Sequence, residues 1–230
     1  MERLMDSQRQ EDLAKRLADI RKRVNVAARE AERNSNDITL IAVSKTFPME
    51  DILALSSHGQ KVFGENRVQE AQTKWSGVRE KIPGLELHFL GPLQTNKTRD
   101  VVGMFDVLHS LDRTKLAETL ARLGEEGLIL PSCFIQVNTG EESGKSGVLP
   151  GDVDAFVKEC RDTYGLPVIG LMCLPPVWEE ASLHFALLDK MAKRNGLACL
   201  SMGMSGDFES AIRLGSTHVR VGEGLFGARS

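Results

Sequence analysis

The sequence predicts a single (β/α)8 TIM barrel with an extra N-terminal helix, an α/β fold formed by residues 1–230 as one domain. Three observations support this prediction. Eight short apolar runs alternate with segments of helical periodicity. The first run, residues 38–45, is apolar on both faces, as in a parallel strand that helices cover. The chain of 230 residues is close to the roughly 250 residues of this fold. An open doubly wound sheet is the alternative.

The elements follow one another in a regular order. Apolar residues at helical spacing predict an opening amphipathic helix, and they are Leu13, Leu17, Ile20, Val24 and Ala28. Runs rich in β-branched and apolar residues predict strands at 38–45, 61–66, 87–90, 105–109, 133–138, 168–174, 197–202 and 217–221. Helices are expected at 49–57, 67–81, after 95, and at 113–123, 151–163, 180–194 and 207–214, with a short turn at 224–227.

Composition narrows the class of protein. The formal charge is -3, and Lys and Arg are scattered rather than gathered in a basic stripe, which argues against nucleic-acid binding. No stretch approaches the roughly 18 apolar residues of a membrane span, and the charged N-terminus has no signal-peptide core, so a cytoplasmic protein is expected. The four cysteines are far apart and are expected to be reduced, and the five histidines show no metal-ligand spacing.

Lys45 is the most informative single residue. It ends the buried strand 38–45, and Pro48 marks the loop that follows. In α/β folds, ligands bind at the carboxyl ends of the strands, and low solvation there can turn an amine into a nucleophile. The alternative is that the ammonium group of Lys45 merely extends from the rim of the sheet into solvent.

The barrel prediction brings other polar residues to the same mouth, because all strand carboxyl ends lie at one end of the barrel. This expected set comprises Lys45, Asn66, Ser110, Asn138, residues 201–205, Arg220 and Gly222. The loops after the seventh and eighth strands carry Ser205 and several glycines, which allow backbone N–H groups to approach an anion. These two loops, with a short terminal turn, predict a phosphate site. The alternative is that the glycines only close turns and Arg220 only pairs with a carboxylate.

The segment at residues 140–146 resembles a phosphate-binding P-loop but does not fit that motif. It reads Gly-Glu-Glu-Ser-Gly-Lys-Ser, but a phosphate-binding P-loop needs four residues between its glycines and this segment has three. Gly147 and Pro150 also prevent the helix that must follow such a loop. A surface loop is therefore predicted.

Several motifs together resemble the pyridoxal phosphate homeostasis protein family. They occur in unbroken order over nearly the whole chain, at residues 41–46 (IAVSKT), 63–66 (FGEN), 88–97 (HFLGPLQTNK), 140–143 (GEES), 200–205 (LSMGMS), 208–209 (FE), 219–222 (VRVG) and 226–227 (FG). The family is similar in fold to the barrel domain of alanine racemase, a fold type III protein, and binds pyridoxal 5'-phosphate (PLP).

The resemblance implies specific roles. Lys45 would hold PLP as a Schiff base, Asn66 would lie near the ring, and Arg220 would face the ring nitrogen or the phosphate. Ser205 and the backbone around Gly222 would hold the phosphate. Met204, Glu223 and Gly224 complete the set expected to contact the cofactor, although Glu223 stands where a serine or threonine is common in the family.

The resemblance also implies a carrier or regulator of vitamin B6 rather than an enzyme. A two-base racemase needs a second acid/base opposite the lysine, and the only tyrosine, Tyr164, is predicted at the end of a helix on the opposite face of the barrel. A monomer that passes PLP to PLP-dependent apo-enzymes is expected. Two alternatives remain open: a weak PLP-dependent amino-acid racemase, and a cofactor-free barrel enzyme that acts on a phosphorylated metabolite.

Overall fold

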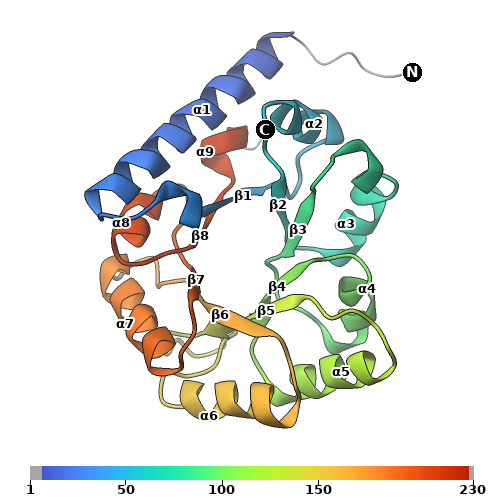
Figure 1. The fold of residues 1–230 in the computed structure, drawn as a ribbon, viewed down its shortest axis with the longest axis vertical. Coiled ribbons are helices and arrows are strands. Elements are labelled where there is room, and N and C mark those ends of the chain that lie inside the picture. The colour runs from blue at the N-terminus through green and yellow to red at the C-terminus, as the bar shows by residue number, and fades with distance from the viewer. Residues whose placement is uncertain (1–6, 228–230) are drawn as a thin grey trace.

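The structure, a computed structural model, describes residues 7–227. Within that range the strands form one closed parallel barrel in chain order, and helices surround it (Figure 1). The strands are β1 (Thr39–Val43), β2 (Val62–Glu65), β3 (Glu86–Phe89), β4 (Val107–Leu111), β5 (Ser132–Val137), β6 (Val168–Cys173), β7 (Cys199–Ser201) and β8 (His218–Val221). Closure between β1 and β8, with Ile41 opposite Arg220, confirms the barrel and excludes the open sheet.

The helices alternate with the strands as predicted. They are α1 (Ser7–Glu30), α2 (Met49–Ser57), α3 (Val68–Trp75), α4 (Thr98–Val102), α5 (Thr114–Glu125), α6 (Val153–Lys158), α7 (Ala181–Arg194), α8 (Phe208–Arg213) and α9 (Glu223–Phe226). Every helix in the described range is too short or too polar to span a lipid bilayer.

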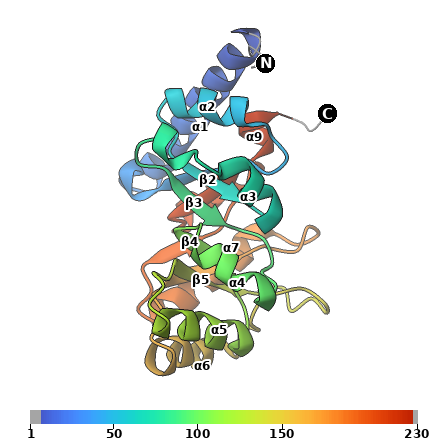
Figure 2. The ribbon, with the colours of Figure 1, turned by 90° about the vertical axis from the view of Figure 1, so that its right-hand side faces the viewer.

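The extra helix α1 packs beside α2, α8 and α9 on the outside of the barrel (Figures 1 and 2). All five of its predicted apolar positions are buried, which confirms the amphipathic pattern. Three ion pairs hold α1 in place: Arg9 contacts Asp51 of α2 at 2.6 Å, Arg23 contacts Glu209 of α8 at 2.6 Å, and Glu30 contacts Arg213 of α8 at 2.7 Å.

Three predicted elements are wrong in detail. The helix predicted at 67–81 is interrupted, because Gly77 adopts a φ of +67° between α3 and a 3-10 turn at Arg79–Lys81. The helix predicted at 151–163 widens into a π-helix at Glu159–Thr163. The fourth strand begins two residues later than predicted, because Val107 pairs with His88, and this places Ser110 inside β4.

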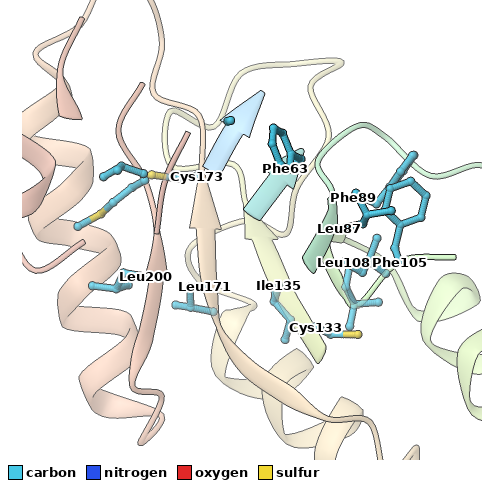
Figure 3. Packing of buried hydrophobic residues seen from close by; sticks show 14 of the residues in the cluster. Phe63, Leu87, Phe89, Phe105, Leu108, Cys133, Ile135, Leu171, Cys173 and Leu200 are labelled. Atoms are coloured by element: carbon cyan, nitrogen blue, oxygen red, sulfur yellow. The ribbon is translucent and has the colours of Figure 1, made fainter. Parts of the chain in front are cut away.

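The main core lies between the strands and the surrounding helices. Figure 3 shows part of it, with Phe89 and Phe105 near Leu87 and Leu108 beside β3 and β4. Three of the cysteines belong to this packing: none forms a disulfide within residues 7–227, and burial raises the pKa of Cys133, Cys160 and Cys173 to about 12. They are therefore protonated packing residues, as predicted.

The interior of the barrel is unusually polar. A small apolar cluster of Val107, Phe134 and Met172 lies beside three histidines, His88, His109 and His218. The ring of His109 stacks on Phe134 with a centroid distance of 4.4 Å. In the described chain, no group of three or more His, Cys, Asp or Glu side chains is placed to hold a metal ion.

Burial keeps His109 and His218 neutral and makes stability depend on pH. Burial lowers the pKa of His218 from 6.5 to about 4, and burial lowers the pKa of His109 well below 6.5. The unfolded chain therefore binds protons as the pH falls below 6.5 while the folded chain does not, so acid favours unfolding. The stabilisation is complete above pH 6.5 and is lost as the pH falls toward 4.

We expect the free energy of unfolding to fall by about 2 kcal/mol from His218 alone between about pH 6.5 and pH 5, with a further loss from His109, measured by urea denaturation across that range. The control is His218→Gln, whose side chain does not titrate. Over the same pH window, the free energy of unfolding of this variant should fall less than that of the wild type, by the contribution of His218. Equal slopes for both proteins would contradict the prediction.

Candidate functional site

A cavity of about 690 Å³ opens at the carboxyl ends of the strands. Residues that follow β1, β2, β3, β6, β7 and β8 line it, as the parallel barrel requires. The lining residues are Val43, Lys45, Phe47, Asn66, Leu90, Met172, Leu174, Met204, Ser205, Gly206, Arg220, Gly222, Glu223 and Gly227. Among the described residues, Lys45 is the one lysine in this lining.

The loop that carries Lys45 is held from two sides. Lys74 of α3 donates a hydrogen bond to the carbonyl oxygen of Ser44 at 2.8 Å, which fixes the end of β1. Thr46 has a φ of +68°, a conformation that costs energy for a residue with a β-branched side chain. The next residue, Phe47, stacks on Phe226 of α9 with a ring distance of 4.4 Å. These contacts hold the backbone on both sides of Lys45, whose half-buried side chain lines the cavity.

Arg220 supplies a buried positive charge on the β8 side of the cavity. It is 5% exposed, and its guanidinium donates to Ser201 Oγ at 2.6 Å and to the carbonyl oxygen of Cys173 at 2.9 Å. Both acceptors are neutral, and no carboxylate in residues 7–227 forms an ion pair with Arg220. Burial lowers the pKa of Arg220, although an arginine remains charged under any ordinary condition. A buried cation without an ion-pair partner is costly even with the carboxylate of Asp207 in its vicinity, and a ligand acceptor in the cavity would relieve that cost.

Asn66 also lacks a partner. Its side-chain oxygen is buried, and no hydrogen-bond donor within the described part of the chain reaches it. The backbone of Asn66 passes so close to Gly91 that a Cβ atom at position 91 would lie 2.0 Å from the Asn66 carbonyl oxygen. Glycine at position 91 therefore allows the close approach that places Asn66 at the cavity. An unsatisfied buried amide oxygen beside a cavity indicates a site built for a ligand with a donor group.

The loops after β7 and β8 meet through a hydrogen bond. The backbone N–H of Gly224, in α9, donates to Ser205 Oγ at 3.2 Å. Gly203 has a φ of +91°, and a Cβ atom there would lie 2.6 Å from Ala211 and 2.9 Å from Phe208, so only glycine lets this loop turn over α8. Small residues and a hydroxyl group at this place form a cradle suited to an anion.

Comparison with known proteins identifies the family. The family model described as "Alanine racemase, N-terminal domain" matches residues 16–230. The pyridoxal phosphate homeostasis protein of Escherichia coli K12 is 38% identical over 227 residues, which cover 95% of this chain and 97% of that protein. The chain belongs to the pyridoxal phosphate homeostasis protein family, within the alanine racemase N-terminal domain fold. The family member of Pseudomonas aeruginosa is 40% identical over 222 residues, which cover 94% and 96% of the two chains.

Solved structures agree with this assignment. PipY of Synechococcus elongatus, in a structure with PLP bound, is 35% identical, covers 94% of this chain and 100% of its own, and superposes with a TM-score of 0.79. Alanine racemase of Corynebacterium glutamicum, at 16% identity, covers 96% of this chain and 62% of its own with a TM-score of 0.67. This second likeness shows the shared fold alone.

Most of the residues that the family motifs singled out meet at the cavity. Seven of them line it: Lys45, Asn66, Met204, Ser205, Arg220, Gly222 and Glu223. Gly224 is not in the lining, but its N–H group supports Ser205.

Five other residues that were expected at the mouth do not line the cavity, and for these the prediction is wrong. They are Ser110, Asn138, Ser201, Met202 and Gly203. Ser110 is buried within β4 because that strand extends two residues further than predicted. Asn138 is bonded to the backbone of Glu142 and so folds the loop at 140–146, which is an irregular, largely exposed surface loop as predicted. Ser201 lies beneath the cavity, where it accepts the hydrogen bond from Arg220.

Sequence reasoning missed the apolar part of this family's cavity. Phe47, Leu90, Met172 and Leu174 line it together with Val43, Gly206 and Gly227. The available signal was position: each apolar member lies at or just after the end of a strand, where a side chain that faces inward also faces the mouth.

Proposed function

We propose that this protein binds PLP in the cavity, holds it as a Schiff base on Lys45, and acts in intracellular PLP homeostasis without robust catalysis of its own. The observation that carries the proposal is that Lys45 and Arg220 line the same cavity, and that Arg220 is a buried cation without an ion-pair partner among the described residues. The names of the 38–40% identical relatives and the PLP-bound PipY structure support it.

The residues of the cavity fit the chemical groups of PLP. When bound, PLP supplies an aldehyde that condenses with an amine, an aromatic nitrogen and a phosphate. Lys45 would offer the amine, and Arg220 would donate hydrogen bonds toward an acceptor such as the ring nitrogen. Ser205 with the backbone near Gly222 and Gly224 would hold the phosphate, and the free oxygen of Asn66 would accept a hydrogen bond from a ring substituent.

Arg220 also favours a carrier over an enzyme. A guanidinium beside the pyridine nitrogen would not transfer its proton, so that nitrogen would stay unprotonated and the ring would be a poor electron acceptor. Tyr164, the only tyrosine, lies just after the π-helix, and its hydroxyl hydrogen-bonds to Glu159 at 3.2 Å, at the amino end of the barrel. It therefore cannot act as the second acid/base of a racemase at this cavity.

We expect the PLP-loaded protein to show negligible decarboxylation and transamination of amino acids. Product formation is measured at a high protein concentration and compared with the background reaction of free PLP. Slow racemisation above that background would favour the alternative of a weak racemase. Robust turnover of any type that is abolished in Lys45→Ala would contradict the carrier function.

A separate prediction concerns Glu223, which borders the cavity as the first residue of α9 and is exposed. A carboxylate directed at the phosphate would cost about 1 to 4 kcal/mol at around 4 Å, whereas one directed at solvent would not. Because glycines flank Glu223 and the residue is exposed, we expect the carboxylate to face solvent. Glu223→Thr should then change the affinity for PLP less than about threefold across a salt series, measured by fluorescence titration. A gain in PLP affinity above about tenfold that shrinks as salt rises would show that the carboxylate faces the phosphate instead.

We further propose that the protein acts as a cytoplasmic monomer and that PLP-dependent apo-enzymes receive its cofactor. Free cysteines, three of them buried, are typical of a reducing compartment. Size-exclusion chromatography with light scattering tests the monomer, and reactivation of a PLP-dependent apo-enzyme by the loaded protein tests the transfer.

A further inference from the structure

A chain of hydrogen bonds runs through the interior of the barrel from its amino end to the cavity. Glu86 Oε1 lies 2.7 Å from His88 Nε2, and His88 Nδ1 lies 2.8 Å from His109 Nε2. The chain continues from His109 Nδ1 to Ser201 Oγ at 2.9 Å, and ends with the 2.6 Å bond from Arg220.

The middle of this chain is shielded from water, while its far end is not. His88, His109 and Ser201 are 0% exposed, whereas the side chain of Glu86 is 45% exposed at the start of β3. The members come from four strands, β3, β4, β7 and β8, so only the closed barrel brings them together.

We propose that Glu86, His88 and His109 are positioning residues for Arg220, and that they act through Ser201 from the end of the barrel opposite the cavity. The inference rests on the proposed function, since Arg220 faces the site assigned to PLP. It assigns a role to buried polar side chains that do not themselves line the cavity.

The two ends of the chain fix the direction of every hydrogen bond. Arg220 can only donate, so Ser201 Oγ must accept from it. At the other end, the hydrogen bond from His88 lowers the pKa of Glu86, so Glu86 is an ionised carboxylate that can only accept. His88 therefore carries a proton on Nε2.

Only one placement of the protons on His88, His109 and Ser201 then gives each of these protons an acceptor. A neutral His88 has a bare Nδ1, which accepts from Nε2–H of His109. His109 is neutral, so its Nδ1 is bare and accepts the hydroxyl proton of Ser201. If His88 carried two protons, Ser201 Oγ would receive two donors, and its own proton would find no acceptor among the described residues.

The consequence is a fixed acceptor for Arg220. The hydroxyl proton of Ser201 is committed to His109, so a lone pair of Ser201 is held toward the guanidinium. The second bond, to the carbonyl oxygen of Cys173, fixes the plane of the group. The remaining N–H groups of Arg220 are thereby held in one orientation at the cavity, and Glu86 provides a negative charge at the far end of the chain.

His218 stands beside the chain rather than in it. Its ring centroid lies 6.0 Å from that of His88 and 6.2 Å from that of His109, and its Nδ1 bonds to Thr217 Oγ1 at 2.8 Å. The charged and titratable groups that face the two chain histidines are therefore Glu86, His218 and Arg220.

The first test uses the protein without PLP. Two-dimensional ¹H–¹⁵N NMR of the histidine side chains should show both His88 and His109 protonated on Nε2 at neutral pH. Protonation of His109 on Nδ1, or a doubly protonated His88, would overturn the proposal.

The second test is Glu86→Gln, which keeps an acceptor of the same shape but removes the charge and adds an amide donor. We expect mixed tautomers at His88 and His109, shifted side-chain signals of Arg220, and PLP affinity that is roughly two- to fivefold weaker. The matched control is Glu80→Gln, an exposed glutamate in the 3-10 turn before β3, which should change none of these.

If Glu86→Gln behaves like Glu80→Gln in tautomers, in Arg220 signals or in PLP affinity, the proposal is wrong. A wild-type protein that binds no PLP would instead disprove the proposed function, and the tautomer result would then decide the hydrogen-bond chain alone.

Discussion

Lys45→Ala is expected to abolish the yellow absorbance of the PLP-loaded protein and the covalent capture of PLP by borohydride. The physical reason is that Lys45 is the one lysine, among the described residues, that lines the cavity, so no other amine can take its place. The fold should survive, because the side chain is only half-buried and lies at the barrel mouth. Circular dichroism and the visible spectrum of the same sample measure both outcomes.

The control is Lys115→Ala, which removes an equally charged, exposed lysine from α5. It should retain the full absorbance and the full borohydride capture. A reducible absorbance band in Lys45→Ala would show that another amine holds PLP and would overturn the assignment. Weak, non-covalent PLP binding in Lys45→Ala is compatible with it, because Arg220 and the Ser205 loop remain.

Glu65→Ala is expected to lower the free energy of unfolding by about 2 to 4 kcal/mol. Glu65 is 0% exposed, and one of its oxygens accepts hydrogen bonds from Ser44 at 2.7 Å, Lys74 at 3.0 Å and Trp75 at 3.1 Å. Its removal leaves three buried donors without this acceptor. The loss of free energy of unfolding should be smaller than if Glu65 were the only carboxylate near Lys74, because Lys74 also contacts Glu70 at 2.9 Å.

Urea denaturation measures the change, and Glu30→Ala is the matched control. Glu30 pairs with Arg213 at 2.7 Å on the surface, with both side chains about half exposed, so its loss should cost less than about 1 kcal/mol. Equal effects of the two substitutions would contradict the prediction. Because Lys74 also bonds to the backbone of Ser44, the loss of Glu65 should weaken the placement of Lys45 and reduce the visible absorbance of the loaded protein.

Local sequence patterns were enough to predict the class of fold. The helix at Met49–Ser57 was predicted with its observed bounds, because Pro48 marks where it starts and its apolar residues repeat at helical spacing. The strand ending near Lys45 was recognisable because a parallel strand covered on both faces is apolar throughout. Such signals depend only on neighbours in the sequence, and for the same reason the interruption at Gly77 and the start of β4 were missed.

The family motifs predicted most of the residues that meet at the cavity, including Lys45, Asn66 and Arg220. They could not show what surrounds each residue. That Arg220 has no carboxylate partner, that the oxygen of Asn66 is left free, and that Ser110 does not reach the mouth are all results of how distant strands align. One residue of shift in a strand reverses the face to which a side chain points.

The barrel, the lysine at its mouth and the family follow from the amino-acid sequence, because they depend on periodicity and on short motifs. The hydrogen-bond chain in which histidines from β3 and β4 join Glu86 to Arg220 through Ser201 is visible only in the folded barrel. In the sequence, His109 and Ser201 are 92 residues apart, and nothing in either segment indicates the other. Barrel closure places both side chains in the same interior, where the absence of water forces them to satisfy each other's hydrogen bonds.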